Sequence, residues 1–223
     1  MITSNQMSSG AVLALGMLFA APAAALDFAI GGRAATTGLG ADVTMRATPR
    51  LNLRASASAF NYTYSDTYDD VAYDAELDLK SAGLLLDFHP FRGAFRISAG
   101  MYANGTDIGL SGAPTQNVQI GGQTFTPAQV GNITGTVEFP STAPYLGIGW
   151  GNAVGERNKF GVNLELGVLF QGSADVELQS NGGTFSNNPA LTNQIEAEEQ
   201  AIENDLSDFK LYPVVAMGVT YSF

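Results

Sequence analysis

The sequence predicts an all-β fold, an eight-stranded antiparallel up-and-down transmembrane β-barrel, and three observations predict it. Segments in which apolar and polar residues alternate recur along the chain, which is the period of a β-strand. Short and long connections between these segments alternate strictly. The charged fraction of 14% is low for a soluble domain, yet no stretch after the N-terminal region is apolar and long enough for a transmembrane helix.

The N-terminus has the pattern of a secretory signal peptide. An apolar run extends from Ala11 to Ala21, and Ala23 and Ala25 form an A-x-A cleavage pattern. We therefore expect residues 1–25 to be a signal peptide and residues 26–223 to be an outer-membrane β-barrel. The first ten residues contain no Lys or Arg, whereas a signal peptide usually starts with basic residues, and a short buried core helix is the alternative.

Eight strands are expected in order after this segment. The stretch up to Thr48 is split at Thr36 to Gly38 into two short strands, because one uninterrupted strand would leave an odd total of seven. The third strand starts at Leu51. The other five are expected at residues 82–89, 95–102, 143–150, 160–170 and 214–223. The long connections are then residues 65–73, 104–132 and 171–208, and they lie at the extracellular end.

The last strand, "VVAMGVTYSF", indicates what surrounds the barrel. Its large residues fall on one side of an extended chain and its small or polar residues on the other. An apolar face that runs to the last residue suits contact with lipid, and closure between the first and last strands removes the unpaired edges that lipid does not tolerate. The terminal aromatic also resembles the signal that the outer-membrane assembly machinery reads. We therefore expect this machinery, lipid and lipopolysaccharide as partners in a Gram-negative outer membrane.

Six aromatic residues lie beside the short turns or at the C-terminus, which places them at one level of the barrel. A ring of aromatics at one height is typical of a membrane interface. The alternative is that they are core residues of a soluble sandwich. This predicted aromatic girdle comprises Phe88, Phe95, Trp150, Phe160, Tyr221 and Phe223.

Charged residues are predicted inside the barrel, although eight strands leave an interior that side chains can fill. Either arginines, carboxylates and tyrosines such as Tyr102 and Tyr145 seal the lumen, or inward glycines leave a narrow wet path that selects a small zwitterion. Buried charges must pair in both cases. The predicted lumen charges are Arg33, Asp42, Arg46, Arg54, Asp87, Arg96 and Glu165.

The long connections are strongly acidic. A cluster of one sign raises the local concentration of cations, although a solvated acidic rim that keeps loops soluble is an equally common explanation. The predicted acidic mouth comprises Asp66, Asp69, Asp70, Asp74, Glu76, Asp78, Glu196, Glu198 and Glu199, with Glu203, Asp205 and Asp208 following in the last loop.

Two local structures are expected within the long connections. Pro189 after Asn188 suits a helix start, and Leu191, Ile195, Ile202 and Leu206 recur near helical spacing, so this helix has an apolar face that caps the barrel or contacts a partner. In "VQIGGQTF", two consecutive glycines predict a two-residue hairpin turn.

Several classes of function are disfavoured by composition. The chain has no cysteine, which excludes disulfides and thiolate metal sites, and its net charge of −11 argues against nucleic-acid binding. We expect no cofactor and no metal site, since the loop acids lack the spacing of a calcium loop. The single histidine, His89, lies in a short turn and is expected to be structural, within the aromatic girdle. We therefore expect no enzyme activity, and a membrane hydrolase ranks third among the hypotheses.

Several motifs taken together resemble the ornithine-uptake, carbapenem-associated (CarO-type) outer-membrane porin family. They are "TTGLGADV", "LDLKSAGLLLDFHPF", "APYLGIGWG", "GVLFQGSADVEL" and "EAEEQAIENDLSDFKLYPVVAMGVTYSF". The resemblance spans nearly the whole mature chain in order and includes the "GGQTFTPAQ" loop. It implies an eight-stranded monomeric barrel linked to uptake of basic amino acids such as ornithine and to entry of carbapenems.

The leading hypothesis is a small, cation-preferring diffusion channel, to which small cationic solutes such as basic amino acids would be the ligands. The alternative is a non-conducting structural or surface-interaction barrel with a solid lumen. The sequence leaves both open, because lumen volume decides between them and volume depends on how side chains from different strands meet.

Overall fold

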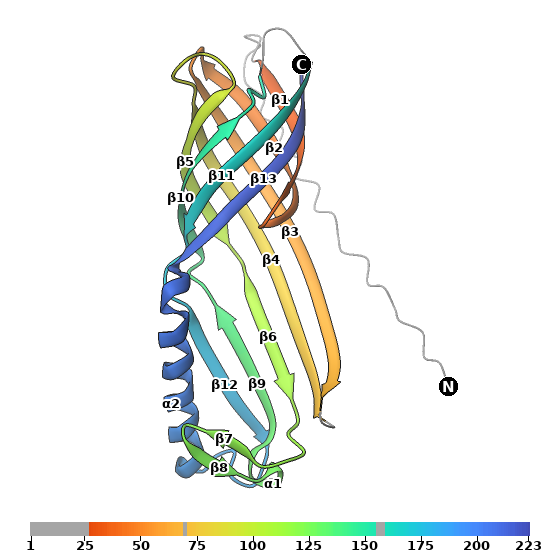
Figure 1. The fold of residues 1–223 in the computed structure, drawn as a ribbon, viewed down its shortest axis with the longest axis vertical. Helices are drawn as coiled ribbons and strands as arrows, with labels where there is room; N and C mark the ends of the chain where they lie inside the picture. Colours follow the sequence, from red (N-terminus) through yellow and green to blue (C-terminus); the bar gives the residue numbers. More distant parts are fainter. Residues whose placement is uncertain (1–26, 69–70, 155–158) are drawn as a thin grey trace, which may run out of the picture.

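Eight antiparallel strands close into a barrel in the computed structural model, which describes residues 27–68, 71–154 and 159–223. The predicted signal peptide, residues 1–25, lies outside these residues. Each strand pairs with its neighbours, and β1 pairs with β13 to complete the ring (Figure 1). The predicted fold class and strand number are therefore confirmed. The barrel strands are β1 (Phe28–Ala35), β2 (Gly38–Thr48), β3 (Leu51–Tyr68), β4 (Val71–Phe88), β5 (Phe95–Asn104), β10 (Thr142–Trp150), β11 (Phe160–Phe170) and β13 (Leu211–Ser222).

The seam between the first and last strands is continuous. The register places Arg33 opposite Gly218, and the amide of Phe223 donates to the carbonyl of Phe28 at 3.0 Å. Residues 36–37 form the turn between β1 and β2, which confirms the predicted split. One end of the barrel, here called the short-turn end, has the first described residues, the C-terminus and the connections that follow β2, β4 and β10 (Figure 1). The opposite end, the long-loop end, has the long connections and the two-residue turn between β1 and β2.

Much of the predicted long loops is β-structure instead. The strands β6 (Asp107–Gly112), β9 (Gly131–Glu138) and β12 (Asp175–Gly182) pair with one another and with β4, in the order β4, β6, β9, β12. The outer halves of β3 and β4 belong to the same wall, called here the outer sheet, which extends from one side of the barrel (Figure 1). The alternation in "DIGLSG" and "DVELQS" is the sequence signal for these strands.

The outer-sheet strands β6, β9 and β12 continue the barrel strands β5, β10 and β11 across short breaks. Residues 139–141 separate β9 from β10, and residues 171–174 separate β11 from β12. Pro140 lies in the first break, where it has no N–H to donate to a ladder. Gly172 lies in the second, with a φ of +82°, and a Cβ on it would lie 3.0 Å from Cγ of Pro140. The two breaks thus meet where the barrel gives way to the outer sheet.

The two predicted local structures are present at the long-loop end. Gly121 and Gly122 have φ values of 57° and 85° and connect β7 (Val118–Ile120) to β8 (Gln123–Phe125), as a two-residue hairpin requires. The helix α2 (Pro189–Asp205) starts after Asn188, whose side chain accepts a hydrogen bond from the amide of Ala190. A short helix α1 (Pro127–Val130) and a 3₁₀ turn η1 (Leu206–Lys210) complete this region.

The apolar face of α2 packs within the long-loop end. Leu191 and Ile195 are buried in one core with Ile120, Phe125 and Val130. The helix contacts β12 and β7, so it covers the edge of the outer sheet and not the barrel opening (Figure 1). This region therefore has a hydrophobic core of its own, separate from the barrel interior.

None of the helices in the described part of the chain is long and apolar enough to cross a membrane.

The two faces of each barrel strand differ as the alternation predicts. On β13, Val215, Met217 and Val219 are more than half exposed, whereas Val214 and Ala216 are buried inside. Large apolar side chains are likewise exposed on the outside of β4, β10 and β11. Such a contiguous apolar surface around a closed barrel fits a lipid environment.

Candidate functional site

The candidate functional site is the barrel lumen, where charged side chains from six strands meet. Three arginines and three carboxylates are buried there or nearly so, and their formal charges cancel. The set, called here the charge network, comprises Arg33, Asp42, Arg54, Asp87, Arg96 and Glu165.

Arg54 and Asp87 form the best aligned pair of the charge network. They lie on adjacent strands β3 and β4, and Arg54 donates through Nε and Nη2 to the two oxygens of Asp87 at 2.9 and 3.0 Å. The hydroxyl of Ser98 on β5 donates to the same carboxylate at 2.6 Å. A bidentate guanidinium–carboxylate pair is among the strongest side-chain interactions, so this pair is fixed in orientation.

Glu165 on β11 joins this pair to the opposite wall. Its Oε2 lies 2.7 Å from Nη2 of Arg54 and accepts a hydrogen bond from Nη2 of Arg96 at 2.6 Å. Its Oε1 accepts a hydrogen bond from the hydroxyl of Tyr145 at 2.7 Å. Since β3 and β11 are not neighbours in the sheet, the contact with Arg54 crosses the barrel interior. Glu165 is therefore the centre of the charge network.

Arg33 is the least satisfied of the three arginines. Its Nη1 donates to Ser56 at 2.8 Å and, at the longer distance of 3.4 Å, to both Asp42 and the hydroxyl of Tyr102. Its Nε and Nη2 are buried without a hydrogen-bond partner among the described side chains and backbone. Buried donors without partners destabilise the folded state, so a rearrangement of the lumen that provides acceptors for Arg33 would be favourable.

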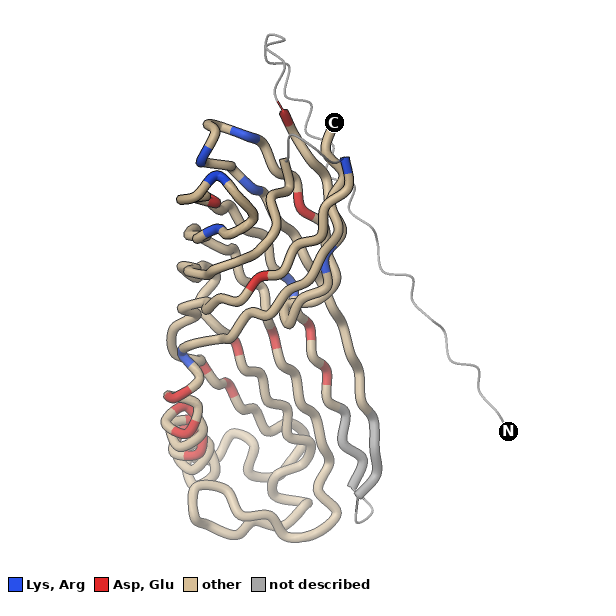
Figure 2. Tube along the Cα trace, turned by 45° about the horizontal axis from the view of Figure 1, so that its top comes forward, with Lys and Arg blue, Asp and Glu red and all other residues tan. Residues whose placement is uncertain are grey.

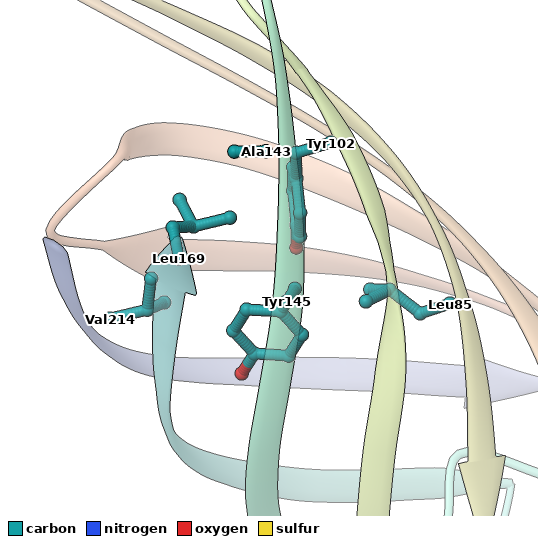
Figure 3. Packing of buried hydrophobic residues seen from close by; sticks show 6 residues of the cluster. All are labelled: Leu85, Tyr102, Ala143, Tyr145, Leu169 and Val214. Atoms are coloured by element: carbon teal, nitrogen blue, oxygen red, sulfur yellow. The ribbon is translucent and has the colours of Figure 1, made fainter. Parts of the chain in front are cut away.

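A layer of apolar and aromatic side chains lies above the charge network, toward the long-loop end. We call it the tyrosine layer, and the two rings at its centre, Tyr102 and Tyr145, meet edge to face with centroids 5.5 Å apart. Figure 3 shows its side chains converging from different strands. Its members are Leu85, Tyr102, Ala143, Tyr145, Leu169 and Val214, all of them almost fully buried.

Inward glycines make room for the two rings. A Cβ on Gly83 would lie 2.7 Å from the ring of Tyr102, and a Cβ on Gly147 or Gly167 would lie within 2.4 Å of the hydroxyl of Tyr145. The rings therefore lie against bare backbone and occupy the volume that the glycines leave. This close packing makes the tyrosine layer a solid section of the lumen.

Small cavities remain on both sides of this layer. One of about 20 Å³ lies among polar side chains that include Asn52, His89 and Arg96. Another of about 10 Å³ lies on the far side of Tyr102, next to Ser81 and Asn104. Each has room for about one water molecule. Within the described residues, the lumen is thus closed to solutes, and the two cavities are separated by the tyrosine layer and by the ion pairs of the charge network beneath it.

The short-turn end of the lumen is closed by polar contacts. The structure buries His89 there, inside the barrel and not in the girdle as expected, with Nδ1 3.0 Å from the carbonyl of Gly93. Burial lowers the pKa of its imidazole. Arg46 forms an ion pair of 3.0 Å with Asp27 and donates to the carbonyl of Val154, whose side chain is buried. Arg46 is therefore separate from the charge network.

The residues of the predicted girdle surround the short-turn end. The ring of Trp150 meets that of Phe95 edge to face, with centroids 5.5 Å apart. The ring centroids of Phe160 and Phe223 lie 5.0 and 4.9 Å from that of Tyr221. Phe88 is exposed on the same outer surface. The structure adds two aromatics that the sequence analysis missed, Phe28, stacked on Phe223, and Phe91, next to Phe95. Both flank short turns or the terminus, so the same positional signal could have found them.

The acids of the predicted mouth are divided among several surfaces. Asp69 and Asp70 lie outside the described residues, and Asp66 and Asp74 belong to the outer parts of β3 and β4. By strand alternation, Glu76 and Asp78 share the outward face of β4 with Leu84, and Asp78 pairs with Lys80. The remaining acids, Glu196, Glu198, Glu199, Glu203 and Asp205, lie on α2, with Asp208 in η1.

Three glutamates of α2 accept hydrogen bonds from backbone amides. Glu199 accepts from the amide of Leu178 at 2.7 Å and Glu203 from that of Val176 at 3.2 Å, both on β12. Glu198 accepts from the amide of Gly121 at 2.9 Å. Since β12 is the edge strand of the outer sheet, these carboxylates cover an edge that would otherwise be open for pairing. They therefore have a structural role that the sequence did not reveal.

Replacing Glu199 and Glu203 together with alanine should loosen this edge. The amides of Leu178 and Val176 lose their acceptors, and an unsatisfied buried group costs about 1–3 kcal/mol. Hydrogen exchange at these two amides should accelerate more than tenfold. The double change to glutamine keeps an accepting oxygen and should restore most of the protection. Alanine at the exposed Glu196 is the matched control, and equal acceleration there would contradict the proposed edge contact.

Comparison with known proteins gives a match by structure and none by sequence. No family model and no curated protein matches the chain. A crystal structure of Acinetobacter baumannii CarO2 matches with a TM-score of 0.57 and 22% identity, covering 89% of this chain and 99% of that one. The chain has a CarO-type fold. A crystal structure of A. baumannii CarO matches similarly, with a TM-score of 0.54, 23% identity and coverage of 87% and 97%.

The CarO-type fold confirms the resemblance that the sequence motifs indicate, at the level of architecture. Nearly the whole length of both CarO structures is covered, so the outer sheet and the barrel are matched together. At 22–23% identity, the match carries no residue roles from CarO to this chain. What the lumen of this CarO-type barrel can do must therefore be derived from its own side chains.

Proposed function

We propose that this chain is a channel-type outer-membrane barrel for small cationic solutes and that the described conformation is its closed state. The observation that carries the proposal is the construction of the lumen. Polar side chains and water-sized cavities lie on both sides of the tyrosine layer, so displacement of that layer, with a rearrangement of the charge network beneath it, would connect them. The incompletely paired Arg33, which contacts Tyr102, supports such a displacement.

The distribution of charge supports a preference for cations. Figure 2 shows acidic residues along α2 and the outer sheet, whereas most basic residues lie in the barrel or toward the short-turn end. A field of this sign raises the local concentration of cations at the long-loop end. Basic amino acids such as ornithine are the solutes that the family resemblance suggests. In this proposal the long-loop end faces the outside of a Gram-negative cell, lipid and lipopolysaccharide surround the barrel, and the assembly machinery reads β13.

Proteoliposome uptake tests this function directly. Ornithine and glutamate are similar in size and opposite in charge, so their rates compare charge selectivity at nearly constant volume. We expect ornithine to enter faster than glutamate, and the ratio to fall toward one as salt shortens the screening length from roughly 30 Å at 0.01 M to about 3 Å at 1 M. Glutamate uptake equal to or above that of ornithine at low salt would refute the cation preference.

A non-conducting surface-interaction barrel is the second candidate. The closed lumen and the separate hydrophobic core of the long-loop end favour it, because that core makes a rigid platform outside the membrane. Uptake of neither solute above the rate of protein-free liposomes would support this candidate and refute the channel.

A further inference from the structure

The outer sheet contains an apolar cavity that the proposed transport function does not use. Its volume is about 270 Å³, and it lies where β6, β9 and β12 face the β7–β8 hairpin. Figure 1 shows these strands beyond the barrel, at the long-loop end. Six residues of its wall carry the inference: Leu110, Pro114, Val118, Ile133, Gly135 and Leu178.

The floor of this cavity follows from the strand register. Leu110 of β6 lies opposite Gly135 of β9, and Gly135 lies opposite Leu178 of β12, so a glycine separates two leucines in one cross-strand row. A Cβ on Gly135 would lie 2.9 Å from Cδ2 of Leu178. The missing side chain at Gly135 thus creates the depression that the leucines border.

The cavity has the size and lining of a small-molecule site. Apolar cavities of about 150 Å³ hold benzene, and ligand pockets start at roughly 300 Å³. The space therefore admits one aromatic ring or a short alkyl chain, and it is too small for a folded partner. Val118, Ile133 and Leu178 also pack against the core of the long-loop end, which holds three sides of the cavity in place.

The surrounding charge restricts which apolar molecules can approach. Glu198 and Glu199 of α2 contact the backbone of Gly121 and Leu178, beside two walls of the cavity. Acidic residues dominate the described part of the long-loop end, where Lys80 and Lys210 are the bases (Figure 2). A fatty acid or another anionic amphiphile is repelled by this field, whereas a cationic one is attracted.

We propose that this cavity is a binding site for a small cationic amphiphile, with the apolar part between Leu110 and Leu178 and the cationic group toward the acidic surface. The site goes beyond the proposed transport function, because it lies on the outer sheet and needs no movement of the tyrosine layer. A ligand bound there stabilises the long-loop end, since it fills apolar space at the margin of its core.

Methyl-detected NMR of the full mature chain in lipid nanodiscs tests the site, with octyltrimethylammonium and octanoate as probes. Empty nanodiscs correct for partition into lipid. The cation should shift the methyl signals of Leu110, Val118, Ile133 and Leu178 in a saturable manner. At low salt, its Kd should be at least tenfold below that of octanoate, and this difference should shrink at high salt.

A matched pair of glycine substitutions locates the site. Gly135→Val fills the floor and should weaken binding of the cation at least tenfold, and the milder Gly135→Ala should weaken it less. Gly109→Val adds the same side chain to the opposite face of β6, where the added Cβ would lie 4.0 Å from Cβ of Glu76, an ordinary van der Waals contact, and should leave the Kd unchanged. Methyl signals of the barrel should be the same in all variants, which verifies the fold.

Three results of the binding measurements would overturn the proposal. They are the absence of saturable binding, a Kd that is unaffected by Gly135→Val, and tighter binding of octanoate than of the cation. Methyl shifts that depend on protein concentration without any probe would show that a second copy of the chain occupies the cavity, which also overturns it. None of these results depends on uptake of ornithine, so failure of this site and failure of the channel are distinguishable.

Discussion

Replacing Glu165 with alanine should lower the free energy of unfolding by about 3–5 kcal/mol, the usual cost of removing one partner of a buried ion pair. Glu165 accepts from Arg96 and Tyr145 and lies 2.7 Å from Arg54. Its removal leaves the lumen with three buried guanidinium groups and two carboxylates. The remaining charges are surrounded by protein and cannot be satisfied by bulk water.

Urea titration of the barrel in lipid vesicles measures this change. Glu165→Gln keeps the shape of the side chain and one accepting oxygen, but it replaces the other oxygen with an amide nitrogen and removes the charge. The stability of this variant should therefore lie between those of the wild type and Glu165→Ala. Glu138→Ala removes an acid from an exposed position of β9 and should change stability by less than about 0.5 kcal/mol. Equal effects at Glu165 and Glu138 would contradict the central position of Glu165 in the charge network.

Replacing both Tyr102 and Tyr145 with alanine should open the lumen. The two rings form the apolar part of the closure between the polar cavities and lie against the backbone of Gly83, Gly147 and Gly167, where no side chain can replace them. A reduction of the opening free energy by 1.4 kcal/mol raises an open population about tenfold. We therefore expect ornithine flux to increase at least tenfold, with current steps in planar bilayers that are larger and more frequent than those of the wild type.

The double change to phenylalanine is the control for this prediction. It removes the hydroxyl contacts to Glu165 and Arg33 but keeps both rings, so ion flux should stay near that of the wild type. Circular dichroism and electrophoretic mobility of the folded form check that each barrel is intact, and Tyr145→Ala alone is available if the double variant does not fold. An intact alanine variant without increased flux would show that the tyrosine layer does not control the lumen.

The sequence predicts only one aspect of the charge network, which is the position of each charged side chain inside the barrel. Strand alternation places Arg54, Asp87 and Glu165 inside, because period two separates the faces of every strand. It does not say which charges meet. Arg54 and Asp87 lie on adjacent strands, but Arg54 and Glu165 meet across the lumen, which depends on barrel diameter and register.

For the apolar residues inside the barrel, the sequence likewise predicts the position of each side chain but not how the side chains pack. Leu85 stands between the outward Leu84 and Leu86, so alternation assigns it to the lumen, where it joins the tyrosine layer. Because Leu84, Leu85 and Leu86 are consecutive, an analysis that lists only the apolar outer face of the strand does not show that Leu85 points inward. Whether the glycines leave a path or the rings fill it depends on side-chain rotamers, which the order of residues does not contain.

The acidic residues of α2 are the case in which sequence was least informative. A run of glutamates indicates a solvated face or a cation-attracting mouth, and both follow from charge alone. Glu199 and Glu203 in fact accept hydrogen bonds from the edge strand β12. This role depends on the outer sheet, whose short strands interrupted by Pro140 and Gly172 were expected as loops.

The sequence by itself determined the class of fold, the lipid-facing side of each strand, the closing pair of β1 and β13, the glycine hairpin and the start of α2. Each of these follows from local periodicity or from residues adjacent in the chain. Only the tertiary structure decided the closure of the lumen, the partners of Glu165, the outer sheet and the apolar cavity at Gly135. These depend on distances between strands far apart in sequence, because side chains that share one enclosed volume exclude one another.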